Sequence, residues 1–194
     1  MIQERPSKRE RTLARLLEAG LELFERQGYD ATTVAEIART AGVTEMTFFR
    51  YFPAKESLLL DDPYDPMLVE AIGRQPLDLP PFARAVRGIR AAWRTVPEPD
   101  QPAIRRRVRI AAGTPSLRGA TWTSTGNTER AIVRRLVEDG ASDHDARIAA
   151  AAVLAALVAG LFAWAEDEST GLAASIERAL DVVDTTVTAG AGDA

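Results

Sequence analysis

Apolar residues recur with the period of an α-helix through most of this chain. Between residues 8 and 27 their spacing of three, four and seven positions places them on one helical face. These residues are Leu13, Leu16, Leu17, Leu21 and Phe24. No run combines strict apolar–polar alternation with many β-branched residues, as a half-buried strand would. Prolines divide the helical pattern into separate helices. Because helical spacing recurs and strand signals are absent, the chain is predicted to be all-α.

Small hydroxyl residues mark where the first three predicted helices begin. Ser7, Thr33 and Thr44 each precede a helical run and can accept a hydrogen bond from an otherwise unpaired backbone N–H. Glu10 and Glu36 follow the first two at the spacing of a capping box. The predicted helices span residues 8–27, 34–41 and 45–51.

The second and third of these helices are short and lie close together in sequence. Gly42 permits a tight turn between them. Phe48 and Phe52 are four residues apart in the third helix, so both are expected to face the core. A longer helix followed by two short ones around a glycine turn is typical of a helix-turn-helix, which inserts its second helix into the DNA major groove.

The remainder of the chain is predicted to be helical with one long interruption. Pro53 ends the third helix, and a fourth helix begins near Ala54. Residues 62–81 are rich in proline and are predicted to be mainly loop, with at most one short turn. Further helices are predicted over residues 81–95, 101–112, 116–139, 143–166 and 169–188.

The face of the third helix that points away from Phe48 is the candidate surface for reading DNA. It carries a carboxylate, a hydroxyl, a guanidinium and an aromatic edge, groups that can contact base edges and thymine methyls. Its residues are Glu45, Met46, Thr47, Phe49 and Arg50.

Other residues nearby are candidates for contacts with the DNA backbone. Thr33 and the free N–H groups at the start of the second helix can hold a phosphate. Lys55 is expected in the first turn of the fourth helix, where the helix dipole disfavours a cation unless a phosphate is near. For the basic cluster two interpretations stay open, a flexible arm in a minor groove or solvated charge attracted diffusely to phosphates. The cluster comprises Arg5, Lys8, Arg9 and Arg11.

Residues 9–60 resemble the DNA-binding domain of the TetR (tetracycline-repressor-like) family. The matching stretch, from Gly28 to Leu59, is G-Y-D-A-T-T-V-A-E-I-A-R-T-A-G-V-T-E-M-T-F-F-R-Y-F-P-A-K-E-S-L-L. Its T-F-F-R-Y-F-P segment is similar to that of an actinobacterial subset of the family. The resemblance implies an N-terminal helix-turn-helix domain over residues 1–57 and a helical effector-binding and dimerisation domain over residues 58–194.

The resemblance also implies roles for individual residues. Thr33, Tyr51 and Lys55 match positions that contact phosphates in the family. A second group matches positions that approach bases or backbone in the groove: Glu45, Met46, Thr47 and Phe49. The family usually has tyrosine at the position of Phe49, so a phenolic hydrogen bond is lost here and contact with a thymine methyl is the alternative.

The last two predicted helices carry apolar faces that one protomer would struggle to cover. Small residues at Ala151, Ala155, Ala159 and Gly160 allow helices to approach closely. We therefore expect a homodimer through these helices, as the resemblance also implies, and hence an inverted-repeat operator.

The middle helices carry more aromatic and aliphatic residues than a simple bundle requires. In the TetR family such helices enclose a pocket for a small-molecule effector that separates the two DNA-binding heads. The residues expected to line a largely apolar pocket are Trp93, Val108, Trp122 and Phe162. The resemblance thus implies a repressor that an unknown small, largely apolar ligand releases from its operator.

Composition excludes several other classes of protein. The chain has no cysteine and a single histidine, His144, so neither a cysteine-based zinc site nor a histidine-based catalytic triad is expected. With no nucleophile–base pair, metal site, cofactor or phosphate-binding loop in the sequence, an enzyme is not expected. Residues 1–10 are polar and do not form a signal peptide, so a cytoplasmic location is expected.

Charge and hydrophobicity leave smaller questions. The net charge is −4, and residues 1–57 hold nine basic and nine acidic residues, so charge alone argues weakly for DNA. Residues 148–165 carry no charge, but half of them are alanine, which favours a buried or interface helix over a membrane span. An arginine run is interpreted as a salt-bridged outer face, with an anion-binding site as the alternative. It comprises Arg105, Arg106, Arg107 and Arg109.

Overall fold

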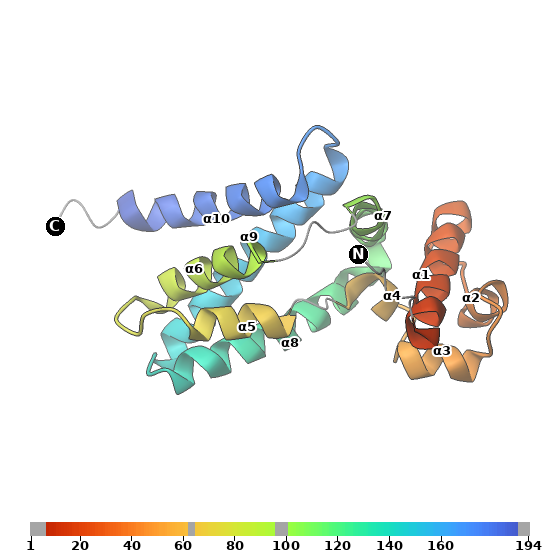
Figure 1. Ribbon diagram of the computed structural model, residues 1–194. Helices are drawn as coiled ribbons and strands as arrows, with labels where there is room; N and C mark the ends of the chain where they lie inside the picture. Colours follow the sequence, from red (N-terminus) through yellow and green to blue (C-terminus); the bar gives the residue numbers. More distant parts are fainter. Residues whose placement is uncertain (1–6, 62–64, 96–100, 190–194) are drawn as a thin grey trace, which may run out of the picture. The chain divides into compact units, whose positions relative to one another are not determined.

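The computed structural model describes residues 7–61, 65–95 and 101–189 (Figure 1). These residues form helices and connecting turns, with no strand among them, so the all-α prediction is confirmed. The helices are α1 (Lys8–Gln27), α2 (Val34–Thr40), α3 (Glu45–Tyr51), α4 (Ser57–Leu60), α5 (Asp65–Gly73), α6 (Pro81–Trp93), α7 (Gln101–Gly113), α8 (Arg118–Glu138), α9 (Asp143–Glu166) and α10 (Leu172–Ala189), with a 3₁₀ turn at Pro115–Leu117.

The helices form two compact units. The first comprises the chain up to Asp61 together with Ile110–Ala120, and the second comprises Asp62–Arg109 and Thr121–Ala194. The chain thus passes between the units at more places than the single predicted boundary after residue 57. The first unit takes in more of the chain because Leu58, Leu59 and Leu117 are buried in the same apolar core as α1.

The first unit begins as the capping residues predict. Ser7 Oγ accepts from the Glu10 backbone N–H at 3.2 Å, and Glu10 Oε2 accepts from the Ser7 N–H at 2.7 Å. The two N–H groups that this box satisfies belong to residues that have no partner within the helix. The capping box therefore fixes the start of α1. The apolar face of α1, on which Leu16 is fully buried, packs on α2 and α3.

Helices α2 and α3 are joined by the turn that Gly42 makes with φ at +66°, a conformation that favours glycine. Phe48 is fully buried and Phe52 nearly so, with their ring centroids 5.6 Å apart, as predicted. The two aromatic rings hold α3 against the core by one face, and the opposite face is left for other contacts.

Two local predictions were wrong. The first is the start of α4, which lies at Ser57, so Lys55 lies in the preceding turn and not in the first turn of a helix. The second is the loop over residues 62–81, which contains α5. Pro66 stands in the first turn of α5, where the missing N–H costs nothing. Leu68 and Ile72, four residues apart, are then both buried.

The second unit is built around α9. Helix α5 packs on α6, and α6 and α10 both pack on α9 (Figure 1). Among the described residues α9 is also the one helix long and apolar enough to cross a membrane, by length and composition alone. Its inner face is covered within the chain: Ala150, Val153 and Trp164 are buried.

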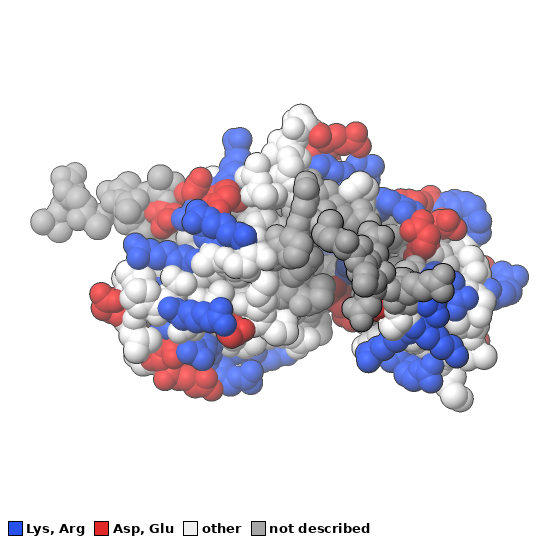
Figure 2. Space-filling view, in the orientation of Figure 1, with Lys and Arg blue, Asp and Glu red and all other residues white. Residues whose placement is uncertain are grey.

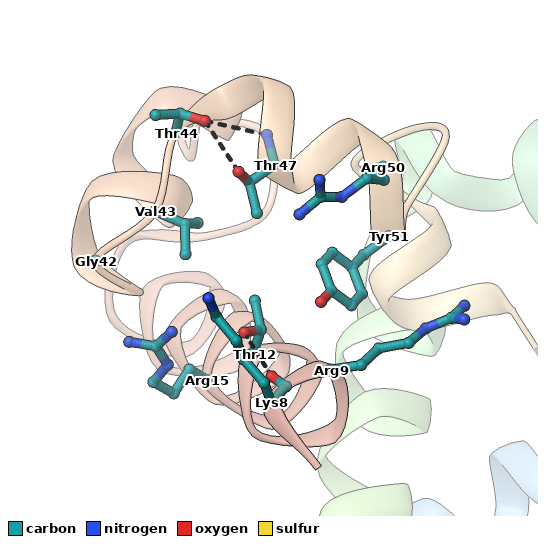
Figure 3. Close-up of a pocket in the computed structure, with 10 residues that line it drawn as sticks. All are labelled: Lys8, Arg9, Thr12, Arg15, Gly42, Val43, Thr44, Thr47, Arg50 and Tyr51. Carbon is teal, nitrogen blue, oxygen red and sulfur yellow. Dashed lines mark hydrogen bonds between the residues drawn. The ribbon is translucent and has the colours of Figure 1, made fainter.

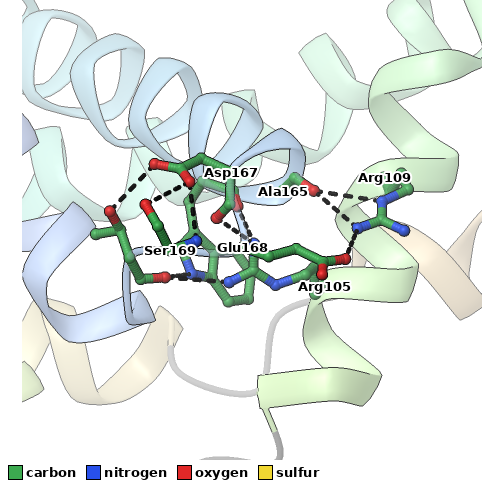
Figure 4. Close-up of polar contacts among 8 residues, drawn as sticks. Arg105, Arg109, Ala165, Asp167, Glu168 and Ser169 are labelled. Atoms are coloured by element: carbon green, nitrogen blue, oxygen red, sulfur yellow. Dashed lines mark hydrogen bonds and ion pairs between the residues drawn. The ribbon is translucent and has the colours of Figure 1, made fainter.

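The arginines of α7 hold the end of α9 and the loop that follows it (Figure 4). Arg105 donates to the backbone oxygen of Trp164, to that of Asp167 at 2.6 Å and to that of Thr170 at 3.1 Å. Its guanidinium lies 4.1 Å from the centre of the Trp164 ring. Free carbonyls at a helix C-terminus attract cations, and Arg105 satisfies them.

Arg109 adds to this contact at the end of α9. It donates to the Ala165 oxygen at 3.2 Å and pairs with Glu168 at 3.1 Å. The predicted salt-bridged face therefore describes Arg109 in part. It does not describe Arg105, which donates to backbone carbonyls about 60 residues further along the chain.

Candidate nucleic-acid interface

The exposed face of α3 carries the side chains predicted to read bases. Met46 is 84% exposed and Phe49 50%, although both are large and apolar. Glu45 is exposed beside them in the first turn. Thr44 caps the helix, since its Oγ1 accepts from the Thr47 backbone N–H at 3.2 Å. A capped seven-residue helix with apolar tips projecting from it can contact a groove of DNA without rearranging.

A hollow of about 810 Å³ lies between α1 and α3 (Figure 3). One wall is the first part of α1, with Lys8, Arg9, Thr12 and Arg15. The other is α3, with Thr47, Arg50 and Tyr51, and the α2–α3 turn at residues 42–44 closes one end. In Figure 3 the Lys8 ammonium, the Arg50 guanidinium and the Tyr51 hydroxyl all point into the space between the helices.

The hollow collects positive charge that no ion pair among the described residues neutralises. Within the described residues, none of Lys8, Arg9, Arg15 and Arg50 forms an ion pair or a side-chain hydrogen bond. Arg50 lies over the Tyr51 ring, with 5.9 Å between its Cζ and the ring centroid. Lys and Arg also gather on this part of the first unit in the space-filling view (Figure 2).

The α1 side of this hollow was only partly foreseen from the sequence. Arg5 of the predicted basic cluster lies outside the described residues. Lys8 and Arg9 belong to α1 itself, so they are not part of a flexible arm. Arg15 was not predicted, although its spacing of seven from Lys8 places the two on one helical face.

Lys55 is held by the protein's own backbone. Its Nζ donates to the carbonyl oxygens of Tyr29 and Thr32, at 2.8 Å each, and lies 4.0 Å from the centre of the Tyr29 ring. Burial lowers the pKa of Lys55, and the negative charges of Asp30 and Glu56 partly offset that effect. Two of its three N–H donors are therefore occupied in tying the segment before α2 to the turn after α3.

Tyr29 takes part in the same cluster. Its hydroxyl donates to Glu56 Oε2 at 3.4 Å. Burial, followed by the negative charge of Glu56, raises the pKa of Tyr29 to about 12. Tyr29 thus stays protonated throughout the physiological range and remains available to Glu56 as a donor.

Thr33 is exposed at the start of α2, as predicted, and forms the second capping box. Its Oγ1 accepts from the Glu36 N–H at 3.2 Å and lies 2.9 Å from Glu36 Oε2. The Thr33 side chain, which is predicted to contact a phosphate, is thus already oriented by its hydrogen bonds with α2. Its contact with DNA stays a prediction.

The residues expected to line an effector pocket differ in how far they are buried. Trp93 and Val108 are half-buried against the core of the second unit, and Phe162 is half-buried on α9. Trp122 is 77% exposed, so the structure does not bear out its expected place in the wall of an enclosed pocket. The fully buried tryptophan is Trp164, whose Nε1 donates to the Thr170 oxygen at 2.9 Å.

No group of three or more histidine, cysteine, aspartate or glutamate side chains in the described part of the chain could hold a metal ion. His144 is exposed at the start of α9.

Two family profiles cover most of the chain. The profile described as bacterial regulatory proteins of the tetR family matches residues 16–61, and that of the MftR C-terminal domain matches residues 80–188. The regulator MftR of Mycobacterium tuberculosis, named for mycofactocin biosynthesis, is 27% identical over 181 residues, which are 91% of each chain.

Solved structures give the same result for the fold. A TetR-family regulator from Streptomyces coelicolor superposes with a TM-score of 0.55 and 25% identity, over 95% of this chain and 98% of that one. NalD, the secondary repressor of the MexAB-OprM multidrug efflux pump in Pseudomonas aeruginosa, gives 0.55 and 24% over 89% and 94%. The chain therefore belongs to the TetR family of bacterial transcriptional regulators, with a C-terminal domain of the MftR type, and is not an enzyme.

Proposed function

We propose that this regulator is a cytoplasmic, homodimeric repressor that binds an inverted-repeat operator and is released by a small, largely apolar ligand. The observation that carries the DNA-binding part is that the exposed tips of α3 lie beside a hollow whose four cations form no ion pair among the described residues. Exposed apolar tips can contact groove edges, and adjacent cations can meet phosphates, so one surface offers both kinds of contact that operator binding requires.

We assign base contacts to the projecting part of α3. Met46 and Phe49 are apolar groups suited to thymine methyls, and Glu45 can accept from a cytosine amino group. The hydroxyl of Thr47 lies at the edge of this surface, bonded to Thr44 at 3.0 Å. Thr33, Tyr51 and the remaining N–H of Lys55 are assigned to the DNA backbone, as their family positions imply.

The dimer is assigned to α9 and α10. Helix α9 leaves Ile148 (56% exposed), Ala151, Ala155 and Ala159 on its surface. Val182 on α10 is 61% exposed. A second copy related by a two-fold axis would cover these apolar residues with the same residues of its own. The two α3 helices of such a dimer would then bind the two half-sites of an operator.

The effector is assigned to the second unit. Trp93, Val108 and Phe162 remain the candidate contacts, because each is an apolar side chain that is half-buried within the second unit. The dimer can take a form in which its two α3 helices do not fit the operator. A ligand that binds this form more tightly than the DNA-binding form would release the protein from DNA.

A gel-shift assay with DNA from immediately upstream of the protein's own gene tests this function. We expect a complex that forms with this DNA at concentrations where a shuffled duplex of the same length stays free. A reporter behind the same DNA should be more active when the regulator's gene is deleted. Equal affinity for both duplexes would reject operator binding, and a less active reporter would show an activator.

A further inference from the structure

We infer that the hollow between α1 and α3 is the main phosphate seat of the protein, in which Lys8, Arg15 and Arg50 bind DNA backbone phosphates. This inference rests on the proposed DNA-binding function and deepens it. It places the main contact with the DNA backbone on a surface that includes the first half of α1. It also assigns Arg50 to the DNA backbone and not to the bases.

The first argument is the charge of the hollow. Four cations line it and, within the residues that the structure describes, none of them forms an ion pair. The first unit also has many acidic residues, but none of those that the structure describes lines the hollow. Clustered like charges repel one another and leave a positive potential that an anion relieves. A chain with a net charge of −4 thus concentrates unbalanced positive charge at this place.

The second argument is the chemistry and direction of the lining groups. The Lys8 ammonium, the Arg50 guanidinium and the Tyr51 hydroxyl point into the space from opposite walls (Figure 3). All three are hydrogen-bond donors, and the guanidinium can bind two phosphate oxygens at once. The hollow is wide and open at the surface, as a site for part of a polymer must be.

The third argument is how α3 divides its residues. Met46 and Phe49 project into solvent, whereas Thr47 and Arg50 line the hollow. The seven-residue helix thus has one edge for bases and one edge for the backbone. A phosphate in the hollow would fix the position of Met46 and Phe49 along the groove, because both edges belong to one short rigid element.

The fourth argument is that Lys55 has another task. Two of its three N–H donors are bonded to the carbonyl oxygens of Tyr29 and Thr32. Among the described residues the cations of the hollow form no such bonds, so binding a phosphate breaks no ion pair or side-chain hydrogen bond there.

The salt dependence of DNA binding tests the inference. Binding of a fluorescein-labelled duplex with the upstream DNA, and of a shuffled duplex, is measured by anisotropy from about 50 to about 200 mM KCl. Each phosphate contact contributes about 0.9 to the slope of log affinity against log salt. We expect Lys8→Gln, Arg15→Gln and Arg50→Gln each to lower the slope by about 0.9 per DNA-bound protomer, and to weaken both duplexes by the same factor.

Arg26→Gln is the matched control. Arg26 is exposed in the last turn of the same helix, outside the hollow, so its loss changes the net charge equally. Its slope should match that of the unmodified protein. Thermal unfolding by circular dichroism verifies that all four variants are folded.

The outcomes separate the inference from the proposed function. If the unmodified protein prefers the upstream duplex but the three hollow variants keep its slope, the phosphate seat alone is rejected. If Arg50→Gln instead changes the preference between duplexes, Arg50 reads bases and its assignment here is wrong. If the unmodified protein binds neither duplex, the proposed function fails and the phosphate seat with it.

Discussion

Lys55 shows how one side chain can hold two segments that are distant in sequence. Its ammonium bonds two carbonyls that precede α2, while its backbone belongs to the turn that follows α3. The Tyr29 ring beneath it adds a cation–π contact at 4.0 Å. Lys55 thus fixes both ends of the helix-turn-helix relative to each other. This positioning is independent of any contact with DNA.

Replacing Lys55 by methionine should therefore destabilise the free protein. The change keeps the length of the side chain but leaves two carbonyl oxygens without their charged donor, so we expect a loss of about 1–3 kcal/mol in the free energy of unfolding. Urea titration followed by circular dichroism measures it.

Lys8→Met is the matched control for this substitution. Lys8 is exposed and makes no ion pair among the described residues, so its loss should change stability by less than about 0.5 kcal/mol. Equal stability of the two variants would show that the bonds of Lys55 to the backbone contribute little.

At the scale of single helices, the predictable part of this protein is the part determined by local chemistry. The capping boxes at Ser7 and Thr33 and the turn at Gly42 each involve residues within four positions of one another. The bounds of α1, α2 and α3, each to within one residue, and the outward face of α3 followed from the sequence for that reason. The exposure of Glu45, Met46 and Phe49 on that face was predicted with them, whereas their contact with bases stays a prediction.

The parts that escaped prediction depend on contacts between distant segments. Lys55 and Arg105 bind backbone carbonyls, which any residue carries, so no side chain marks their partners in the sequence. The hollow needs α1 and α3 to be placed side by side before Arg15 and Arg50 can share it. Helix α5 was missed because its proline suggested a loop, whereas the burial of Ile72 on α6 favours a helix.

The contact between α5 and α6 depends on the absence of one side chain. A Cβ added to Gly88 would lie 2.5 Å from the Cα of Ile72, which is backbone and cannot move aside without shifting α5. Gly88→Ala should therefore destabilise the second unit by about 1–3 kcal/mol, despite the better helix propensity of alanine. Urea titration followed by circular dichroism measures the change.

Gly126→Ala is the control for Gly88→Ala, since both glycines lie within helices. At Gly126 the nearest atom to an added Cβ is the flexible end of Arg130, at 3.5 Å. Alanine is the better helix former by about 1 kcal/mol, so this variant should be as stable as the original chain or more so. Stabilisation by both substitutions would contradict the close packing of α5 on α6.

At the scale of the whole molecule, the proposed dimer requires α9 to pack both inside its own chain and against a second copy. Gly160 serves the first purpose, because a Cβ there would lie 2.7 Å from the Cβ of Ala179 on α10. The predicted small-residue stripe is thus divided: Gly160 faces α10, and Ala151, Ala155 and Ala159 are exposed. Exposed alanines in the uncharged stretch 148–165 of α9 cost little in one protomer and would permit close approach of another.

A charge placed in this stripe should separate the proposed dimer. Ala155→Glu puts a carboxylate near the middle of α9, and a two-fold axis would bring the partner's copy close to it. Burying two like charges costs several kcal/mol, so we expect a monomer in sedimentation velocity at micromolar concentration. Because a monomer offers only one reading helix, its affinity for the upstream DNA should fall steeply, while its binding to shuffled DNA changes less.

Ala91→Glu adds the same charge on α6, where the side chain is exposed and lies outside the proposed interface. It should sediment like the original chain and bind the upstream DNA equally well. If Ala155→Glu sediments as the same dimer, the copies associate through another surface. If the original chain is itself a monomer that still prefers the upstream DNA, a single α3 with its adjoining phosphate seat is sufficient for recognition, and the two-fold arrangement is unnecessary.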